Sequence, residues 1–364
     1  MLQPTLFDPI KLVSAKRTRN ERQGVHSWHP YYAGYAEAFV ESAIDFLGTS
    51  PKGVILDPWN GSGTTNIVAS RLGICSIGCE VNPVMNVFAS AKQAALLKHK
   101  NEINQLVKSV LKFARAEKTR LVEEDPLLEF MTPQLVGIIR SVYSSLGNLE
   151  YPEVEYGKPL RKFFRRKVTP LNPFQAFLTA ALFVLARSIA GYKPGSNPTW
   201  IKSSSEKPTM AWKDFEIAYK DKVAAMFANL DMADLGGSDE LTALIVEADS
   251  RRLPLSASTI DGVITSPPYL TRIDYAISVK PELLIMSSSE HFRSIRENTI
   301  GAPVIVDKDI SIADSWGATC CDILRKVEGH KTKAARSYYL PNMLQYFRDM
   351  ELSLSEINRV LKPG

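Results

Sequence analysis

Apolar positions along this chain follow two periods that alternate over much of its length. Short apolar runs, with the length of buried strands, lie at 54–56, 75–81, 243–249 and 260–266. Apolar residues with helical spacing lie at 35–47, at 66–72, from Pro83 to about Lys118, and at 340–361. The alternation predicts an α/β fold, a Rossmann-like sheet with helices on both faces.

Two long segments interrupt this alternation. Residues 119–239 predict a mainly helical insertion, in which Phe174–Ala190 is too short and too polar for a membrane span and indicates a core helix. Residues 283–337 predict a second, irregular insertion. The chain thus divides into an arm with the first half of the sheet (1–118), the helical insertion (119–239) and the second half of the sheet (240–364).

Composition narrows the class of protein without naming a function. Apolar residues make up 45% and charged residues 23% of the chain, as in ordinary folded proteins, and the net charge of +5 is compatible with a nucleic-acid partner. The four cysteines form no CxxC pair or Cys/His cluster, so we expect free thiols and no metal. The N-terminus lacks the apolar core of a signal peptide, and we expect a reducing, cytoplasmic setting.

A glycine-rich loop follows the first predicted strand. It runs from Asp57 to Thr65 (DPWNGSGTT) and precedes a helix, so its backbone can approach a polar ligand and the helix offers free N–H groups. Glu80 ends the second strand, where a carboxylate can accept both hydroxyls of a ribose. Asp249 ends the third, where it can accept from an adenine amino group. Together these residues predict a pocket for an adenosine-bearing ligand.

A second loop, Thr265–Tyr269 (TSPPY), ends the fourth predicted strand. Its two prolines fix the backbone. The Ser266 hydroxyl and the Pro267 carbonyl can both accept hydrogen bonds from one exocyclic amino group, which orients the nitrogen lone pair and offsets positive charge as it develops. Tyr269 offers a flat face for a base turned out of a duplex. The alternative for this loop is a structural proline-rich turn with a packed tyrosine.

The pairing of LDPWNGSGTT with DGVITSPPY resembles the amino-methyltransferases of restriction–modification systems. HSWHPYYAGYAEAFV (26–40) is similar to the family segment that closes the cofactor site, and the final INRVLKPG is similar to the helix end before the fifth strand. The resemblance implies S-adenosylmethionine as cofactor, double-stranded DNA as partner, and direct methyl transfer to an amino nitrogen without a covalent intermediate. A serine at the first position of the catalytic loop is typical of N4-cytosine enzymes.

Carried over by position, the resemblance implies two sets of site residues. The implied cofactor-binding set is His29, Pro30, Asp57, Pro58, Asn60, Gly61, Ser62, Gly63, Thr64, Thr65, Glu80, Val81, Asp249 and Thr265. The implied catalytic set is Ser266, Pro267, Pro268 and Tyr269.

Two basic stretches are candidates for contact with DNA. The first lies within 158–167, where Phe163 and Phe164 are interleaved with cations, and its candidate phosphate contacts are Arg161, Lys162, Arg165, Arg166 and Lys167. A solvated helix face is the alternative explanation. The second stretch, with Arg325, Lys326, Lys331, Lys333 and Arg336, could equally cover the target groove.

Several alternatives stay open at this point. N6-adenine methylation on the same fold is the nearest, and RNA methylation follows it. A non-catalytic DNA-binding subunit of a multi-chain complex is an alternative of another class. A nicotinamide-binding protein is disfavoured because NGSGTT lacks the GxGxxG spacing. The family sheet has seven strands, and no strand pattern follows LKPG here. We therefore expect a truncated chain or a second polypeptide that completes the sheet, with a divergent sheet as the third possibility.

Overall fold

The computed structural model describes residues 12–18, 20–29, 34–50, 52–117, 124–154, 160–194, 201–232, 242–270 and 273–363. Within these ranges the main sheet has four strands, β1 (Val54–Asp57), β2 (Cys75–Glu80), β5 (Ala243–Glu247) and β6 (Gly262–Val263). All pairings in it are parallel, and the strand order is β5-β2-β1-β6. The order reverses between β2 and β6 on either side of β1, which places a ligand crevice beyond the carboxyl end of β1.

Alternation along the strands places helices on both faces of the sheet, as expected for the Rossmann-like fold. Ile55 packs against α1 (Glu37–Leu47) and α2 (Thr64–Arg71) in one buried cluster. Its neighbours Val54 and Leu56 point to the other face, where the end of α11 (Leu340–Val360) packs. The predicted fold class is therefore confirmed, and the four predicted strands lie where their apolar runs stand.

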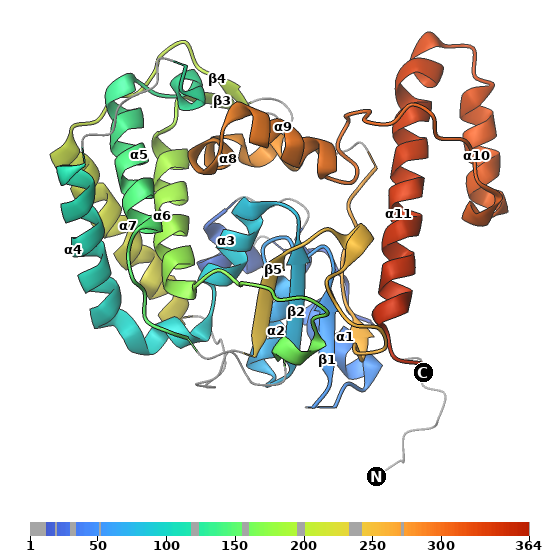
Figure 1. Ribbon diagram of the computed structural model, residues 1–364, viewed down its shortest axis with the longest axis horizontal. Coiled ribbons are helices and arrows are strands. Elements are labelled where there is room, and N and C mark those ends of the chain that lie inside the picture. The colour runs from blue at the N-terminus through green and yellow to red at the C-terminus, as the bar shows by residue number, and fades with distance from the viewer. Residues whose placement is uncertain are drawn as a thin grey trace.

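A helical layer packs beside the sheet (Figure 1). Its long members are α4 (Lys100–Ala116), α5 (Pro133–Gly147), α6 (Pro173–Ile189) and α7 (Trp212–Met232), joined by α3 (Pro83–Ala91). The α6 helix is apolar on nearly every side and is buried among the others, which confirms the predicted core helix. No helix in the described part of the chain is long and apolar enough to cross a membrane. A short antiparallel pair, β3 (Tyr192–Pro194) and β4 (Ile201–Ser203), lies at one end of this layer.

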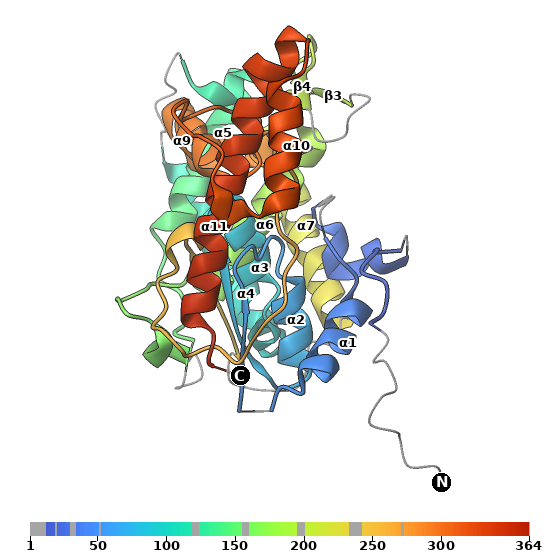
Figure 2. The same ribbon diagram turned by 90° about the vertical axis from the view of Figure 1, so that its right-hand side faces the viewer.

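The prediction of an irregular segment at 283–337 was wrong. It holds most of α8 (Lys280–Met286) and all of α9 (Ser289–Asn298) and α10 (Ala318–Glu328). The α9 helix buries only Ile295, and α10 buries only Cys321 and Leu324, so each has only one or two buried apolar positions to mark it in the sequence. Figure 2 shows α10 and α11 as a hairpin that rises beyond the sheet.

Short helical turns connect these elements. They are η1 (Asn20–Arg22), η2 (Gly24–Ser27), η3 (Ala94–His99), η4 (Pro126–Glu129), η5 (Leu160–Phe163), η6 (Ser250–Arg252), η7 (Ile277–Val279), η8 (Asp314–Trp316) and the π-helical turn η9 (Ala335–Tyr339).

Candidate functional site

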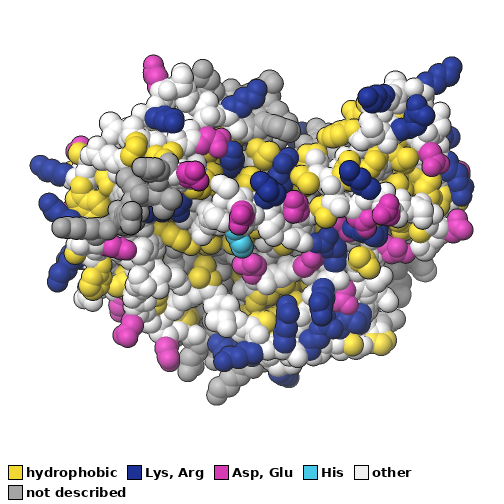
Figure 3. All heavy atoms as spheres, turned by 45° about the horizontal axis from the view of Figure 1, so that its top comes forward, with side chains coloured by type: hydrophobic (Ala, Val, Ile, Leu, Met, Phe, Trp, Pro, Cys, Tyr) yellow, Lys and Arg dark blue, Asp and Glu magenta, His cyan; other side chains and the backbone are white. Residues whose placement is uncertain are grey.

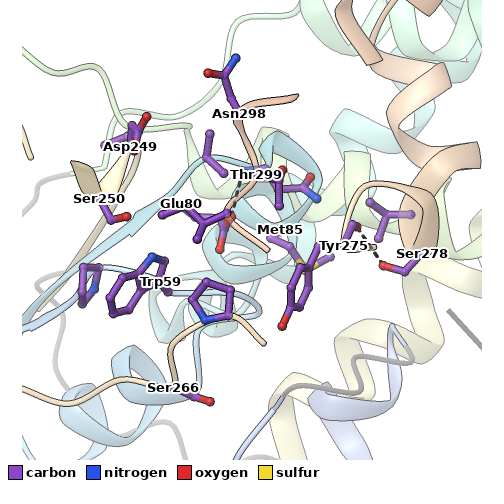
Figure 4. Close-up of a pocket in the computed structure, with 17 residues that line it drawn as sticks. Trp59, Glu80, Met85, Asp249, Ser250, Ser266, Tyr275, Ser278, Asn298 and Thr299 are labelled. Carbon is purple, nitrogen blue, oxygen red and sulfur yellow. Dashed lines mark hydrogen bonds between the residues drawn. The ribbon is translucent and has the colours of Figure 1, made fainter. Parts of the chain in front are cut away.

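A pocket lies at the carboxyl ends of the parallel strands, where the strand order predicts a ligand site. It encloses about 670 Å³ of free space, its open mouth included. The pocket is lined by Pro58, Trp59, Glu80, Val81, Asn82, Met85, Ala248, Asp249, Ser250, Ser266, Pro268, Tyr275, Ser278, Val279, Asn298, Thr299 and Ile300. In Figure 4, Glu80 and Thr299 lie near the middle of these residues and Ser266 lies at the edge. The pocket therefore joins both predicted loops with residues from α9 and η7.

Glu80 places a carboxylate on the pocket wall. Its two oxygens accept hydrogen bonds from the backbone N–H groups of Gly61 (2.8 Å) and Asn82 (2.9 Å). Burial raises the pKa of this carboxyl to about 7, although both N–H groups act in the opposite direction. A ligand that donates hydrogen bonds to Glu80 would replace the missing solvent.

Asp57 is fully buried beneath the glycine loop and does not line the pocket. It accepts hydrogen bonds from Tyr35 (2.7 Å), Thr65 (2.9 Å) and Thr265 (2.6 Å), so it ties the start of α2 to the first residue of the second loop. Burial raises the pKa of Asp57, and these donors oppose the rise. The structure therefore supports a role for Asp57 in holding the two loops together from behind the pocket wall.

The rest of the glycine loop supports the pocket from behind. Gly63 has φ 85°, and a Cβ there would lie 2.9 Å from the Cβ of Ala89, so only glycine fits without a shift. The Asn60 side chain covers Gly78 closely, and both of its amide atoms are buried without a partner among the described residues. None of the predicted cofactor residues Asn60, Gly61, Ser62, Gly63, Thr64 and Thr65 lines the pocket.

Asp249 lines the pocket, and its carboxylate is already engaged. The guanidinium of Arg251 binds it at 2.7 Å and also binds Asp349 of α11 at 2.9 Å. The same guanidinium donates to the carbonyl of Asn298 at 3.1 Å. An adenine amino group would thus share Asp249 with Arg251, and the pocket rim is connected to α11.

The second loop is held from two sides. Tyr346 of α11 donates to the Pro268 carbonyl at 3.0 Å, and the Tyr269 N–H donates to the Tyr275 hydroxyl at 3.1 Å. The Ser266 hydroxyl makes no hydrogen bond within the described ranges, and the Tyr269 side chain is 47% exposed. Gly301 lies directly over the loop, since a Cβ there would meet the Tyr269 carbonyl at 2.4 Å. The loop is therefore rigid, the Ser266 hydroxyl is available to accept a hydrogen bond, and the Tyr269 ring is accessible.

Some predicted residues lie elsewhere. His29 is buried against Phe88, with ring centroids 5.1 Å apart, and it does not line the pocket, while Pro30 lies outside the described residues. Pro267, Tyr269 and Thr265 stand beside the lining rather than in it. Thr299 and its neighbours were missed because the segment around them was predicted to be irregular, whereas Trp59 stands within the glycine loop and could have been found.

The basic stretch near η5 packs on the face of the sheet. Phe163 and Phe164 pack against the buried cluster of that face, and Arg165 donates to the Leu253 carbonyl at 2.7 Å. In Figure 1 this green segment lies toward the lower end of the sheet, whereas the strand arrows point to the upper end. The aromatic rings between these cations therefore serve packing, and contact of Arg161, Lys162, Arg166 and Lys167 with DNA stays a prediction.

Comparison with known proteins gives matches to one family. A family model described as DNA methylase matches residues 9–89, which include the glycine loop and Glu80. The type II methyltransferase M.BsoBI of Geobacillus stearothermophilus is 26% identical over 79% of this chain and 57% of its own length. The type II methyltransferase M.ScaI of Streptomyces caespitosus is 43% identical over 18% of this chain and 20% of its own length. No solved structure matches.

The chain spans little more than half the length of the first of these relatives and a fifth of the second. The chain is thus similar to DNA methylases over residues 9–89 and to a type II methyltransferase over 79% of the chain.

Proposed function

We propose that this chain transfers a methyl group from S-adenosylmethionine to an exocyclic amino group of double-stranded DNA, at N4 of cytosine, within a restriction–modification system. The observation that carries the proposal is the position of Ser266 and Pro268 on the same pocket as Glu80 and Asp249. A methyl donor and an amino acceptor must meet within one cavity. Glu80 and Asp249 provide groups for the donor, and Ser266 provides one for the acceptor.

The pocket has groups that fit the proposed cofactor. Glu80 offers carboxylate oxygens to a ribose diol, and Asp249 offers an acceptor to an adenine amino group. The indole N–H of Trp59, a residue that lines the pocket, is buried without a partner in the described part of the chain, so a polar ligand would satisfy it. When bound, S-adenosylmethionine supplies a sulfonium methyl group.

The second loop would act on the target base. The Ser266 hydroxyl and the Pro267 carbonyl would accept both amino hydrogens, which turns the nitrogen lone pair toward the methyl group. The two acceptors would hold the nitrogen while it takes the methyl group, and the nitrogen would then release one proton to solvent. The half-exposed ring of Tyr269 would stack on the base outside the duplex. Rate enhancement would come from positioning and electrostatics alone.

Cytosine is proposed as the target because Ser266 stands first in the loop, as in the N4-cytosine enzymes that the sequence resembles. The type II methyltransferases that match the chain support a role in restriction–modification. Adenine N6 remains the competing target, because the same two acceptors could hold either amino group.

The test is methyl transfer by the purified chain from labelled S-adenosylmethionine to duplex DNA, followed by mass spectrometry of the nucleosides. N4-methylcytosine is the expected product, and N6-methyladenine would replace the cytosine assignment. Loss of one preorganised hydrogen-bonding group costs about 10²-fold in turnover, so we expect Ser266→Ala to lower kcat to that extent with cofactor affinity kept. Ser294→Ala, an exposed serine on α9, is the matched control. Full turnover in Ser266→Ala would remove Ser266 from the reaction.

A further inference from the structure

The hairpin of α10 and α11 ends in an exposed, basic tip, residues 325–339. Five cations in this stretch stand against the single carboxylate of Glu328, and all five are exposed: Arg325, Lys326, Lys331, Lys333 and Arg336. Tyr338 and Tyr339 are 40% and 52% exposed beside them. Figure 3 shows Lys and Arg side chains on the projecting part of the molecule at the upper right.

The charges at the tip are free to bind a ligand. Within the described residues no ion pair involves Lys331, Lys333 or Arg336. Arg325 has only long contacts, at 3.8 Å, to the exposed carboxylates of Asp314 and Asp322. This differs from Arg165 of the η5 stretch, which is bound to a backbone carbonyl and lies 3.6 Å from Glu356. Unpaired surface cations without packing partners suit a polyanion.

The distance between the tip and the Ser266 loop also suits contact with DNA. Tyr346 of α11 touches the Pro268 carbonyl, which fixes the height of the catalytic loop along the helix. At an α-helical rise of about 1.5 Å per residue, Leu340 at the start of α11 stands about 9 Å further along the axis, and the π-helical turn η9, which holds Arg336, extends this interval. The major groove of DNA is about 12 Å wide, so phosphates next to an extruded base fall within this interval.

We propose that the tip of the α10–α11 hairpin binds the phosphate backbone of duplex DNA beside the target base, with Lys331, Lys333 and Arg336 as the phosphate contacts. The proposal rests on the proposed function, since it takes the Ser266 loop as the place where the base is received. Phosphate contacts position a duplex without reading its sequence. The tip therefore sets affinity and orientation, and sequence is read elsewhere.

The experiment compares two triple variants by titration of a labelled random-sequence duplex at several salt concentrations. The test variant is Lys331→Ala/Lys333→Ala/Arg336→Ala. The control is Lys108→Ala/Lys112→Ala/Arg115→Ala, three exposed cations on α4 at the opposite side of the molecule. Each lost phosphate contact lowers the slope of log K against log salt by about 0.9, so we expect the test variant to lose about 2.7 and the control to lose nothing.

Two further measurements separate this proposal from the proposed function. Cofactor affinity in the test variant should equal that of the unchanged chain, which also verifies folding, and methyl transfer should recover at low salt and high DNA concentration. If the chain never transfers methyl groups but the slope still falls in the test variant, DNA binding by the tip is supported and the proposed methyl transfer is rejected. An unchanged slope in the test variant, a fall in Arg165→Ala/Arg166→Ala instead, or preference for single-stranded RNA would overturn the proposal.

Discussion

At the scale of the residue, Glu80 shows how a pocket can prepare a charge for a ligand. The carboxyl is held by two backbone N–H groups and is nevertheless shifted in pKa to about 7 by burial. In the free protein it thus titrates near neutral pH. A ribose diol that donates to it needs the ionised form as the better acceptor.

This titration predicts a pH-dependent cofactor affinity. Below pH 7 the carboxyl is protonated in the free protein, so binding must release a proton and the Kd should rise by at most about tenfold per pH unit. Above about pH 8 the Kd should be constant. Calorimetry at pH 6 and pH 8 measures the Kd and the proton released.

The same shift has the opposite sign for the stability of the free protein. Because the folded pKa of Glu80 is raised, its contribution to stability is fully present below the unfolded pKa and is lost as pH rises through about 7.

Glu80→Gln should weaken cofactor binding and abolish the pH dependence of the Kd, whereas Glu247→Gln on the adjacent strand β5 should keep that dependence. A Kd in Glu80→Gln that still changes between pH 6 and pH 8 would assign the titration to another group.

Strand-end acids could be found in the sequence, but their partners could not. The positions of Glu80 and Asp249 followed from where apolar runs end, and both line the pocket. Asp57 was expected beside the cofactor because of the family resemblance. It is buried instead, because Tyr35 and Thr265, which are distant in sequence, both donate to it.

At the scale of the element, α11 connects the rim of the pocket with the Thr265–Tyr269 loop. Asp349 binds Arg251 at the pocket rim, and Tyr346 donates to Pro268 three residues earlier on the same helix. The sequence predicted this helix from its apolar spacing. The contacts of Asp349 and Tyr346 could not be predicted, because the apolar pattern says nothing about the partners of polar positions.

We expect Tyr346→Phe to loosen the catalytic loop while leaving the cofactor site intact. One hydrogen bond to a carbonyl is worth about 1 kcal/mol, so kcat should fall about fivefold to tenfold with little change in cofactor Kd. Tyr151→Phe removes the same type of bond, to the Leu146 carbonyl in the helical layer, and should leave kcat unchanged. Equal losses in the two variants would indicate a general stability effect and not a role in positioning the loop.

Elements that bury most of their side chains were predictable, and short helices with few buried side chains were not. The strands and α6 bury most of their side chains, so their patterns are complete. The α9 helix is held by the Arg296–Asp274 ion pair, and α10 rests on one side of α11. The residues Asn298 to Ile300, which line the pocket, were missed for that reason.

At the scale of the whole molecule, the helical layer braces the wall of the pocket. Arg187 of α6 binds Glu282 of α8 and donates to the carbonyl of Ser278, a lining residue, at 2.6 Å. The Glu282 side chain is fully buried, and that of Arg187 is 12% exposed. The helical segment 119–239, which was predicted to be an insertion, is therefore connected to the pocket by these contacts of Arg187.

We expect Arg187→Ala to destabilise the whole protein, because it leaves the buried carboxylate of Glu282 without its guanidinium. Breaking a buried ion pair from one side costs about 3–5 kcal/mol, measurable as a lower urea midpoint. Lys220→Ala breaks the exposed pair with Glu216 on α7 and should cost no more than about 0.5 kcal/mol.

The paired replacement Arg187→Leu/Glu282→Leu separates charge burial from packing. It removes both charges, so it should restore most of the stability that Arg187→Ala loses. It also removes the donor to the Ser278 carbonyl, so cofactor affinity should stay below that of the unchanged chain even where stability returns. If stability and affinity recovered together, the helical layer would support the pocket through its bulk alone; if neither recovered, the contribution of Arg187 would lie in packing rather than in charge.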